Sequence, residues 1–296
     1  MAVSIAARGA LGIRKEASFA SGGGIDNWQV IESQSIRQSK IYIYQDKIRN
    51  SPEQINGQYS HEVVSGSIVF PITPTNPTQW WECGIGGSTS PYTPQIPLSS
   101  LAIEIQEGQI GTVQTSGDMI GRMEFSSKKG DVLRCSVDIE GVGLSNLPTA
   151  STASFPSGDG PYLHSECTFT LDGIANQNVE SFTVAKENNL ITDLYGNTPR
   201  RREIPATKAQ VTGTLSILFS DTTMRTRFMN QLPSRITALY QRGSKSFQLD
   251  LVNVNYDVSE RPMESQTSFI LETLNFTAYV NDPTVQNSLK LTVVTT

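Results

Sequence analysis

The sequence is poor in the residues that most often carry chemistry or covalent cross-links. Its 296 residues include three cysteines (Cys83, Cys135 and Cys167) and two histidines (His61 and His164). The cysteines form an odd set without CxxC spacing, so the pattern favours neither a disulfide framework nor a structural zinc site. Such cysteine usage is typical of a protein made in a reducing compartment, which we expect to be the cytoplasm.

Charged residues and long apolar runs are also scarce. Charged side chains make up 17% of the chain and the net charge is −5. A cluster of Lys and Arg large enough to neutralise several phosphates is missing, so tight binding of DNA or RNA is not expected. The N-terminus lacks a basic region followed by an apolar core, and no run of apolar residues reaches the length of a membrane span. We therefore expect a soluble chain without a signal peptide.

The candidate catalytic and ligand sites are few and weak. His164 and Cys167 are spaced i, i+3 and could form a nucleophilic pair or half of a metal site, but no further ligands cluster near them. Asp138 and Glu140 could form a glycosidase-like carboxylate pair, although such pairs on exposed strands are usually solvated surface. The glycine-rich stretches neither follow a strand nor open a helix, so a phosphate loop is not expected. The sequence predicts a protein that is not an enzyme and holds no cofactor or metal.

The chain is rich in Ser, Thr, Asn and Gln and in short runs of alternating apolar and polar residues. Period-two alternation bounded by turn residues is typical of antiparallel β structure. The predicted strands cover residues 39–45, 61–70, 101–107, 119–125, 131–141, 168–171, 179–185, 208–220, 246–258, 267–280 and 288–294. Two short helices are expected, over 77–84 and 221–232. The sequence therefore predicts a mainly β protein, an antiparallel sandwich or barrel with one or two short flanking helices.

Two halves of the chain share a pattern. Residues 63–73 (VVSGSIVFPIT) and 210–221 (QVTGTLSILFSD) each contain Val, one residue, Gly and then alternating apolar positions, followed by a predicted helix. A glycine inside a strand usually marks a bend or a close backbone approach. We expect a small-residue N-terminal arm over 1–24 and a β domain over 25–296. Its half-motifs, about 25–144 and 163–296, are joined by the polar loop 145–162.

These segments together resemble a known family. LGIRKEASFASGG in the arm, VVSGSIVFP, FTLDGIANQNVESFTVAKENNLI and QVTGTLSILFSD occur in an order similar to that of tail tube proteins of long-tailed bacteriophages. The resemblance spans essentially the whole chain and extends to the inner tubes of contractile injection machines. It implies a β-sandwich flanked by a helix, assembled into six-fold rings that stack into a hollow tube with a continuous inner β-barrel.

The resemblance also implies partners and a location. The partners would be further copies of the chain, the tail terminator, baseplate and tape-measure proteins, a sheath in contractile tails, and double-stranded DNA passing transiently through the bore. The protein would reside in the virion tail after synthesis in the host cytoplasm, without inserting into a membrane.

Alternation within the predicted strands nominates the residues that would face the lumen. These residues lie on the small, polar side of strands whose other side is apolar. They are Ser65, Ser67, Arg134, Ser136, Asp138, Glu140, Ser181, Thr183, Gln210, Thr212, Thr214 and Ser216. Such a wall is mostly neutral with some anionic character, so DNA phosphates would find little to bind. The alternative for each strand is a solvated outer face.

A second set of residues is expected to contact neighbouring copies. Apolar side chains of the arm would dock on a neighbour, adjacent tryptophans would anchor a short helix with one ring at an interface, and a basic loop would pair with acidic groups of the next ring, such as Asp46, Glu53 or Asp118. The set is Ile5, Leu11, Ile13, Phe19, Trp80, Trp81, Arg200, Arg201 and Arg202.

Two other classes of function remain open from the sequence. One is a different β protein of the virion, such as a tail terminator or a capsid decoration protein. The other is a carbohydrate-binding module that uses Trp80 and Trp81 as a stacking platform beside Asp138 and Glu140.

Overall fold

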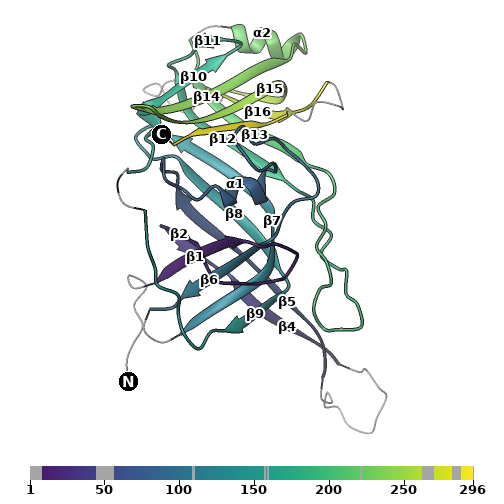
Figure 1. Cartoon of the computed structure of the whole chain (residues 1–296). Helices are drawn as coiled ribbons and strands as arrows, with labels where there is room; N and C mark the ends of the chain where they lie inside the picture. Colours follow the sequence, from purple (N-terminus) through teal and green to yellow (C-terminus); the bar gives the residue numbers. More distant parts are fainter. Residues whose placement is uncertain are drawn as a thin grey trace.

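The computed structural model describes residues 9–44, 57–108, 111–156, 158, 160–220, 222–261, 270–281 and 288–295. It confirms the prediction of a mainly antiparallel β fold with two short helices. The elements of the first half gather at the bottom of Figure 1 and those of the second half at the top. The elements of the first half are β1 (Ala10–Lys15), β2 (Asn27–Gln29), β3 (Ser33–Gln34), β4 (Arg37–Ile43), β5 (Gln58–Pro71), α1 (Gln79–Gly84), β6 (Leu101–Gln106), β7 (Thr112–Lys128), β8 (Arg134–Gly141) and β9 (Gly143–Asn146).

The second half repeats the element order of the first. Its elements are β10 (Cys167–Leu171), β11 (Ile174–Ala175), β12 (Val179–Glu187), β13 (Gln210–Leu218), α2 (Thr223–Met229), β14 (Ser234–Arg242), β15 (Lys245–Glu260), β16 (Leu271–Ala278) and β17 (Lys290–Val294). The β10–β11 turn, at Asp172 and Gly173, has positive φ at both residues, a backbone conformation that the Asp-Gly dipeptide favours.

One continuous sheet runs through both halves, and we call it the long sheet. Its strand order is β4–β5–β8–β7–β12–β13–β16–β15, and every neighbouring pair is antiparallel. The first four strands come from the first half and the last four from the second. The pairing of β7 with β12 is the junction between the halves.

Each half also has a smaller outer sheet that packs on the core side of the long sheet. The first has the order β2–β1–β6–β7–β9, and the second has the order β11–β10–β14–β15–β17. The long strands β7 and β15 therefore each belong to an outer sheet at one end and to the long sheet at the other. The two halves have the same connectivity.

The apolar core is continuous between the long sheet and the outer sheets. Trp81 of α1 lies 5.9 Å, between ring centroids, from Phe125 of β7 and 5.5 Å from Phe247 of β15, so it joins the cores of the two halves. Phe70 stacks on Trp80 at 5.1 Å. Both tryptophans are buried, which explains why so short a helix holds its position against the sheet.

The glycines of the shared pattern occupy equivalent places where backbones approach closely. A Cβ atom on Gly66 would collide with the backbone of Ile36, and a Cβ on Gly213 would collide with the carbonyl oxygen of Thr183 and the ring of Phe276. A larger residue would push the neighbouring segment away at either site. The glycine in each half-motif therefore marks a close approach, one of the two roles predicted for it.

The N-terminal arm differs from its prediction. Residues 10–15 form β1, which pairs with β2 on one side and β6 on the other, and Leu11 and Ile13 are fully buried in the core. Composition misled the prediction because small residues are typical of loose arms, whereas here they allow close strand packing: Gly12 lies against Trp28. Residues 1–8, which include Ile5, lie outside the described residues.

Candidate functional surface of the long sheet

The side of the long sheet that faces away from the core carries mostly polar side chains, with apolar ones such as Val69 and Leu218 among them. On β8 the burial alternates strictly, with Cys135, Val137 and Ile139 buried and the polar residues between them only half-buried. None of the twelve residues predicted to face the lumen is buried in the chain's own core. The structure brings all twelve together on this one surface, which we call the polar face. What the polar face contacts in an assembly remains a prediction.

Hydroxyl and amide groups on the polar face bond to each other across strands. Ser216 Oγ lies 3.0 Å from Thr273 Oγ1, and Thr214 Oγ1 donates to Asn275 Oδ1 at 3.1 Å. Ser67 Oγ lies 3.0 Å from Ser35 Oγ. Because these groups already have partners within the sheet, the face presents few strong donors to a passing ligand.

The strands β7 and β16, like the edge strands β4 and β15, contribute residues to the polar face that the sequence analysis missed. The alternation was visible in β7 and β16, since Met123 and Phe125 of β7 and Leu274 and Phe276 of β16 are the buried positions. Missing from the predicted set were Arg122, Glu124, Ser126, Thr273, Asn275 and Thr277. The predicted strand over 119–125 ended too early to place Ser126, and a bulge in β7 between Ile120 and Arg122 shifts the alternation there.

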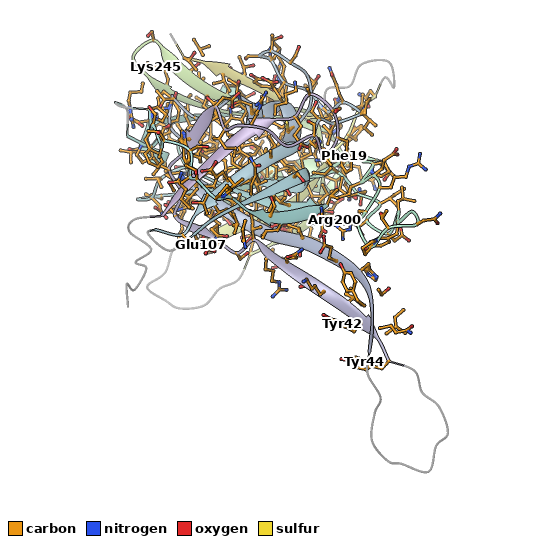
Figure 2. The ribbon with its side chains drawn as sticks, turned by 60° about the horizontal axis from the view of Figure 1, so that its bottom comes forward. Phe19, Tyr42, Tyr44, Glu107, Arg200 and Lys245 are labelled. Atoms are coloured by element: carbon orange, nitrogen blue, oxygen red, sulfur yellow. The ribbon has the colours of Figure 1, made fainter. Side chains whose placement is uncertain are left out.

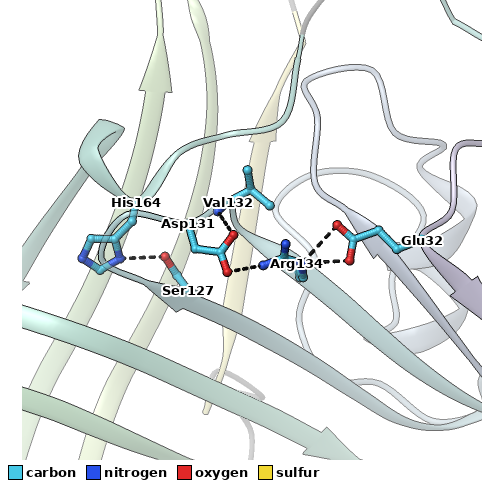
Figure 3. Close-up of polar contacts among 6 residues, drawn as sticks. All are labelled: Glu32, Ser127, Asp131, Val132, Arg134 and His164. Carbon is cyan, nitrogen blue, oxygen red and sulfur yellow. Dashed lines mark hydrogen bonds and ion pairs between the residues drawn. The ribbon is translucent and has the colours of Figure 1, made fainter.

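Two arginines on the polar face, Arg134 and Arg122, are paired with carboxylates. Arg134 bonds to Asp131 at 2.6 Å and to Glu32 at 2.8 Å (Figure 3). The hydrogen bond from Arg134 lowers the pKa of Asp131. Arg122 pairs with Glu124 and lies 3.7 Å from Glu187 across the junction between the halves. A guanidinium already held by carboxylates has little free capacity for a phosphate.

The basic loop that includes Arg200, Arg201 and Arg202 makes ion pairs with its own chain, and of the three arginines Arg201 is buried rather than exposed as predicted. Arg201 is buried and bonds to Glu140 at 2.7 Å. Arg200 bonds to Glu62 of β5 at 2.5 Å, and the backbone of Glu62 donates to Pro199. The Arg202 side chain is 79% exposed, and its guanidinium lies 4.0 Å from the Glu203 carboxylate. Pairing within the chain, invisible in the sequence, buries Arg201, whereas the Arg200 side chain stays 57% exposed, so a contact of Arg200 with the next ring stays a prediction.

The acidic partners suggested for that loop are also placed differently. Asp118 is fully buried and accepts a hydrogen bond from Thr115 Oγ1, so it cannot reach a neighbouring copy. Asp46 and Glu53 lie outside the described residues.

Burial raises the pKa of Asp118 to about 8, above a value of 3.8 for the unfolded chain. Between these values the folded state holds a proton that the unfolded state has lost, so this contribution to stability is complete below about pH 4 and disappears as pH rises through about 8. Asp118→Asn should therefore gain stability relative to the parent, by about 5 kcal/mol, when pH is raised from about 4 to 9. Denaturant unfolding at both pH values measures this change. The prediction would be contradicted if the difference in unfolding free energy between Asp118→Asn and the parent did not change with pH, as is expected for the exposed control Asp257→Asn.

The paired strands β4 and β5 extend beyond the rest of the sheet as a two-stranded ribbon, which we define as residues 41–44 and 58–61. Figure 2 shows Tyr42 and Tyr44 along this ribbon, away from the body of the molecule, with Arg200 nearer its base. Ile41 is 40% exposed and Ile43 is 59% exposed. A two-stranded ribbon with exposed apolar side chains is only marginally stable by itself in water. The ribbon thus has the features of a contact surface.

The remaining predicted contact residues lie inside the subunit. Leu11, Ile13, Trp80 and Trp81 are buried in the chain's own core, so their side chains are not presented to a neighbour in this conformation. Phe19 is partly buried against a small cluster formed by Met119, Val142 and Ile204. Burial of both tryptophans also removes the stacking platform that a carbohydrate-binding site would need.

The histidines and cysteines form no arrangement suited to catalysis. The two ring nitrogens of His164 lie 2.8 Å from Ser127 Oγ and 3.0 Å from the carbonyl oxygen of Val179. Burial raises the pKa of Cys167 to about 12, which keeps the thiol protonated at neutral pH. Within the described residues no three His, Cys, Asp or Glu side chains cluster as a metal site. Neither described helix has the length and apolar character needed to cross a bilayer.

The chain matches a known protein family. A family model described as "Phage tail tube protein" matches residues 6–278, which is nearly the whole chain. No curated protein matches it.

Proposed function

The chain belongs to the phage tail tube protein family, and from this premise we propose that its copies close side by side into rings and that the rings stack into a hollow tube. The polar face would line the bore, with the six-fold repeat that the sequence resemblance implies. The tube would conduct the genome from the virion into the host cell.

The observation that carries this proposal is the composition of the polar face. Hydroxyl and amide groups of β13 bond to those of β16, Ser67 of β5 bonds to Ser35, and the arginines Arg122, Arg134 and Arg201 are each paired with carboxylates. A DNA duplex slides along such a wall without being held, because its phosphates meet few free cations and several anions.

The ribbon supports stacking of the rings. It projects from one end of the molecule, opposite the end that carries α2 (Figure 1). We propose that its exposed Ile41, Tyr42, Ile43 and Tyr44 contact a copy in the adjacent ring, where their apolar surface would be removed from water. The ends of the stacked tube would meet the tail terminator and baseplate proteins, and the tape-measure protein would occupy the bore before ejection.

Electron microscopy of the purified chain tests the proposal. Hollow rings or tubes are the expected result. Discrete monomers or small globular oligomers at high protein concentration would instead favour a terminator or decoration protein, and retention of the chain on glycan resins would favour a sugar-binding module.

A further inference from the structure

The junction between the two halves of the chain shows how two edges of the long sheet pair with each other. Within the chain, the long-sheet segment of β7 pairs antiparallel with β12. By position in the repeat, β15 corresponds to β7, and β3 with β4 corresponds to β12. The unpaired edges at the two ends of the long sheet are therefore copies of the two edges that already pair at its centre.

The correspondence holds residue by residue. Ser33 pairs with Val69 and Arg37 with Ser65, just as Ser181 pairs with Ser216 and Ala185 with Thr212. This places Arg37 at the position of Ala185 and Ser39 at that of Glu187.

The same holds for the long strands, down to an irregularity in their pairing. The register of β7 with β8 shifts between Ile120 and Arg122, and that of β15 with β16 shifts between Tyr256 and Val258. Val258 therefore stands where Arg122 stands in the first half. By the same register, Glu260 corresponds to Glu124.

Both outer edges are open in the part of the chain that the structure describes. Residues 37–43 of β4 pair only with β5, and residues 255–260 of β15 pair only with β16. Open edges of this length template pairing with another chain, and proteins usually cover them. A heterologous contact between two different edges of identical copies closes into a ring when the rotation permits.

We propose that the β15 edge of one copy pairs antiparallel with the β4 edge of the next copy, in the register of the internal β7–β12 junction. This inference rests on the proposed ring and names the surfaces that form it. In the internal junction, Ala185 lies opposite Glu124 and Glu187 lies opposite Arg122. Replacing each residue by its equivalent in the repeat puts Arg37 opposite Glu260, and Ser39 opposite Val258, of the adjoining copy.

The charges at the two edges are complementary in this register. Exposed Arg37 meets exposed Glu260 as a direct cross-strand pair. In the repeat, Lys40 corresponds to Asn188, whose backbone bonds to Gly121, and Gly121 corresponds to Asp257. Lys40 of one copy therefore lies beside Asp257 of the next. The internal junction carries an equivalent ion pair, between Arg122 and Glu187 at 3.7 Å. Opposite charges directly across a strand pair stabilise it, whereas like charges destabilise it.

The repeat also sets the number of chains in a ring. Each chain supplies two four-stranded units to the wall, and the junctions within and between chains are equivalent. A ring with six such units, the six-fold repeat proposed above, then needs three chains rather than six. The ring is three-fold symmetric in chains and approximately six-fold symmetric in four-stranded units.

The test is cross-linking of the double variant Ser39→Cys/Val258→Cys in assembled tubes under mild oxidation. Background is low because Cys83 and Cys135 are buried and burial raises the pKa of Cys167 to about 12. We expect most chains to join into covalent oligomers that end at a closed species of three. A mixture of the two single variants should give only dimers.

Register is tested by Ser39→Cys/Glu260→Cys, whose cysteines would be diagonal rather than opposite, about 7–8 Å apart and beyond easy disulfide reach. This control should cross-link several-fold less. Tubes in which the off-register pair reacts equally well, or in which neither pair reacts, would overturn the edge pairing while leaving the tube function intact. Absence of rings or tubes from the unmodified chain would overturn the tube function itself, and this pairing with it.

Charge exchange gives an independent measurement if the cysteine variants fold poorly. Arg37→Glu and Glu260→Arg should each reduce assembly several-fold, and combining them should restore it. Failure of the combined variant to assemble better than either single variant would also overturn the proposed register.

Discussion

A chain that begins at Gly24 is expected not to fold, because it loses β1 from the middle of the first outer sheet. Leu11 and Ile13 are fully buried, and replacing a single buried residue of this kind by alanine usually costs about 2–5 kcal/mol. Removal of the strand also exposes edges of β2 and β6. The total loss is comparable to the stability of a whole domain, about 5–15 kcal/mol.

The same truncation removes Glu16, whose buried carboxylate holds the following turn in place. It accepts hydrogen bonds from Ser100 Oγ at 2.5 Å and from the backbone of Gly117 at 3.1 Å and Gly22 at 2.7 Å. Circular dichroism and denaturant unfolding measure the effect, with a chain that begins at Gly9 as the control because it keeps all of β1. Cooperative unfolding of the chain that begins at Gly24, at a denaturant concentration near that of the full chain, would show that β1 is dispensable.

Replacing Ile41 and Ile43 together by aspartate is expected to abolish polymerisation while leaving the subunit folded. Both side chains lie on the exposed ribbon, so the free energy of unfolding should change by less than about 1 kcal/mol. Burial of an isoleucine at a contact contributes about 1.5–3 kcal/mol, and a buried aspartate adds a desolvation cost. Because both isoleucines lose this contribution at every contact along a tube, the affinity of one copy for the next should fall by more than about tenfold.

Ile174→Asp is the matched control for the ribbon variant. Ile174 is 75% exposed and lies on β11, at the other end of the molecule from the ribbon (Figure 1). Sedimentation of assembled protein at several concentrations compares the two variants with the parent. Normal tubes from the ribbon variant would exclude a role in stacking, and equal losses in both variants would show that the effect is not specific to the ribbon.

Local patterns in the sequence were sufficient to predict most of the strands. Alternation over 131–141 and 208–220 placed the apolar residues of β8 and β13 in the core and their polar neighbours on the other face, because side-chain direction in a strand depends only on position parity. The two helices were visible from a proline stop and a glycine end.

Contacts between distant segments could not be predicted in the same way. The pairing of Arg201 with Glu140 joins residues that are 61 positions apart, and composition gave no indication that β1 fills a gap between β2 and β6. The repeat was detectable as two similar glycine-containing strands, but the equivalence of the β7 and β15 irregularities needed the pairing registers. Those registers are the basis for inferring how copies join.

The central claim is that the polar face lines an enclosed bore, and labelling in assembled tubes tests it most directly. Cysteine would replace Ser67 and Thr214 on the polar face and, as the outside control, the exposed Thr168 of β10. A maleimide attached to a bulky polymer should label all three sites in dispersed subunits, but only the Thr168 site in intact tubes. Equal labelling of Ser67 and Thr214 sites in tubes and in subunits would contradict the claim.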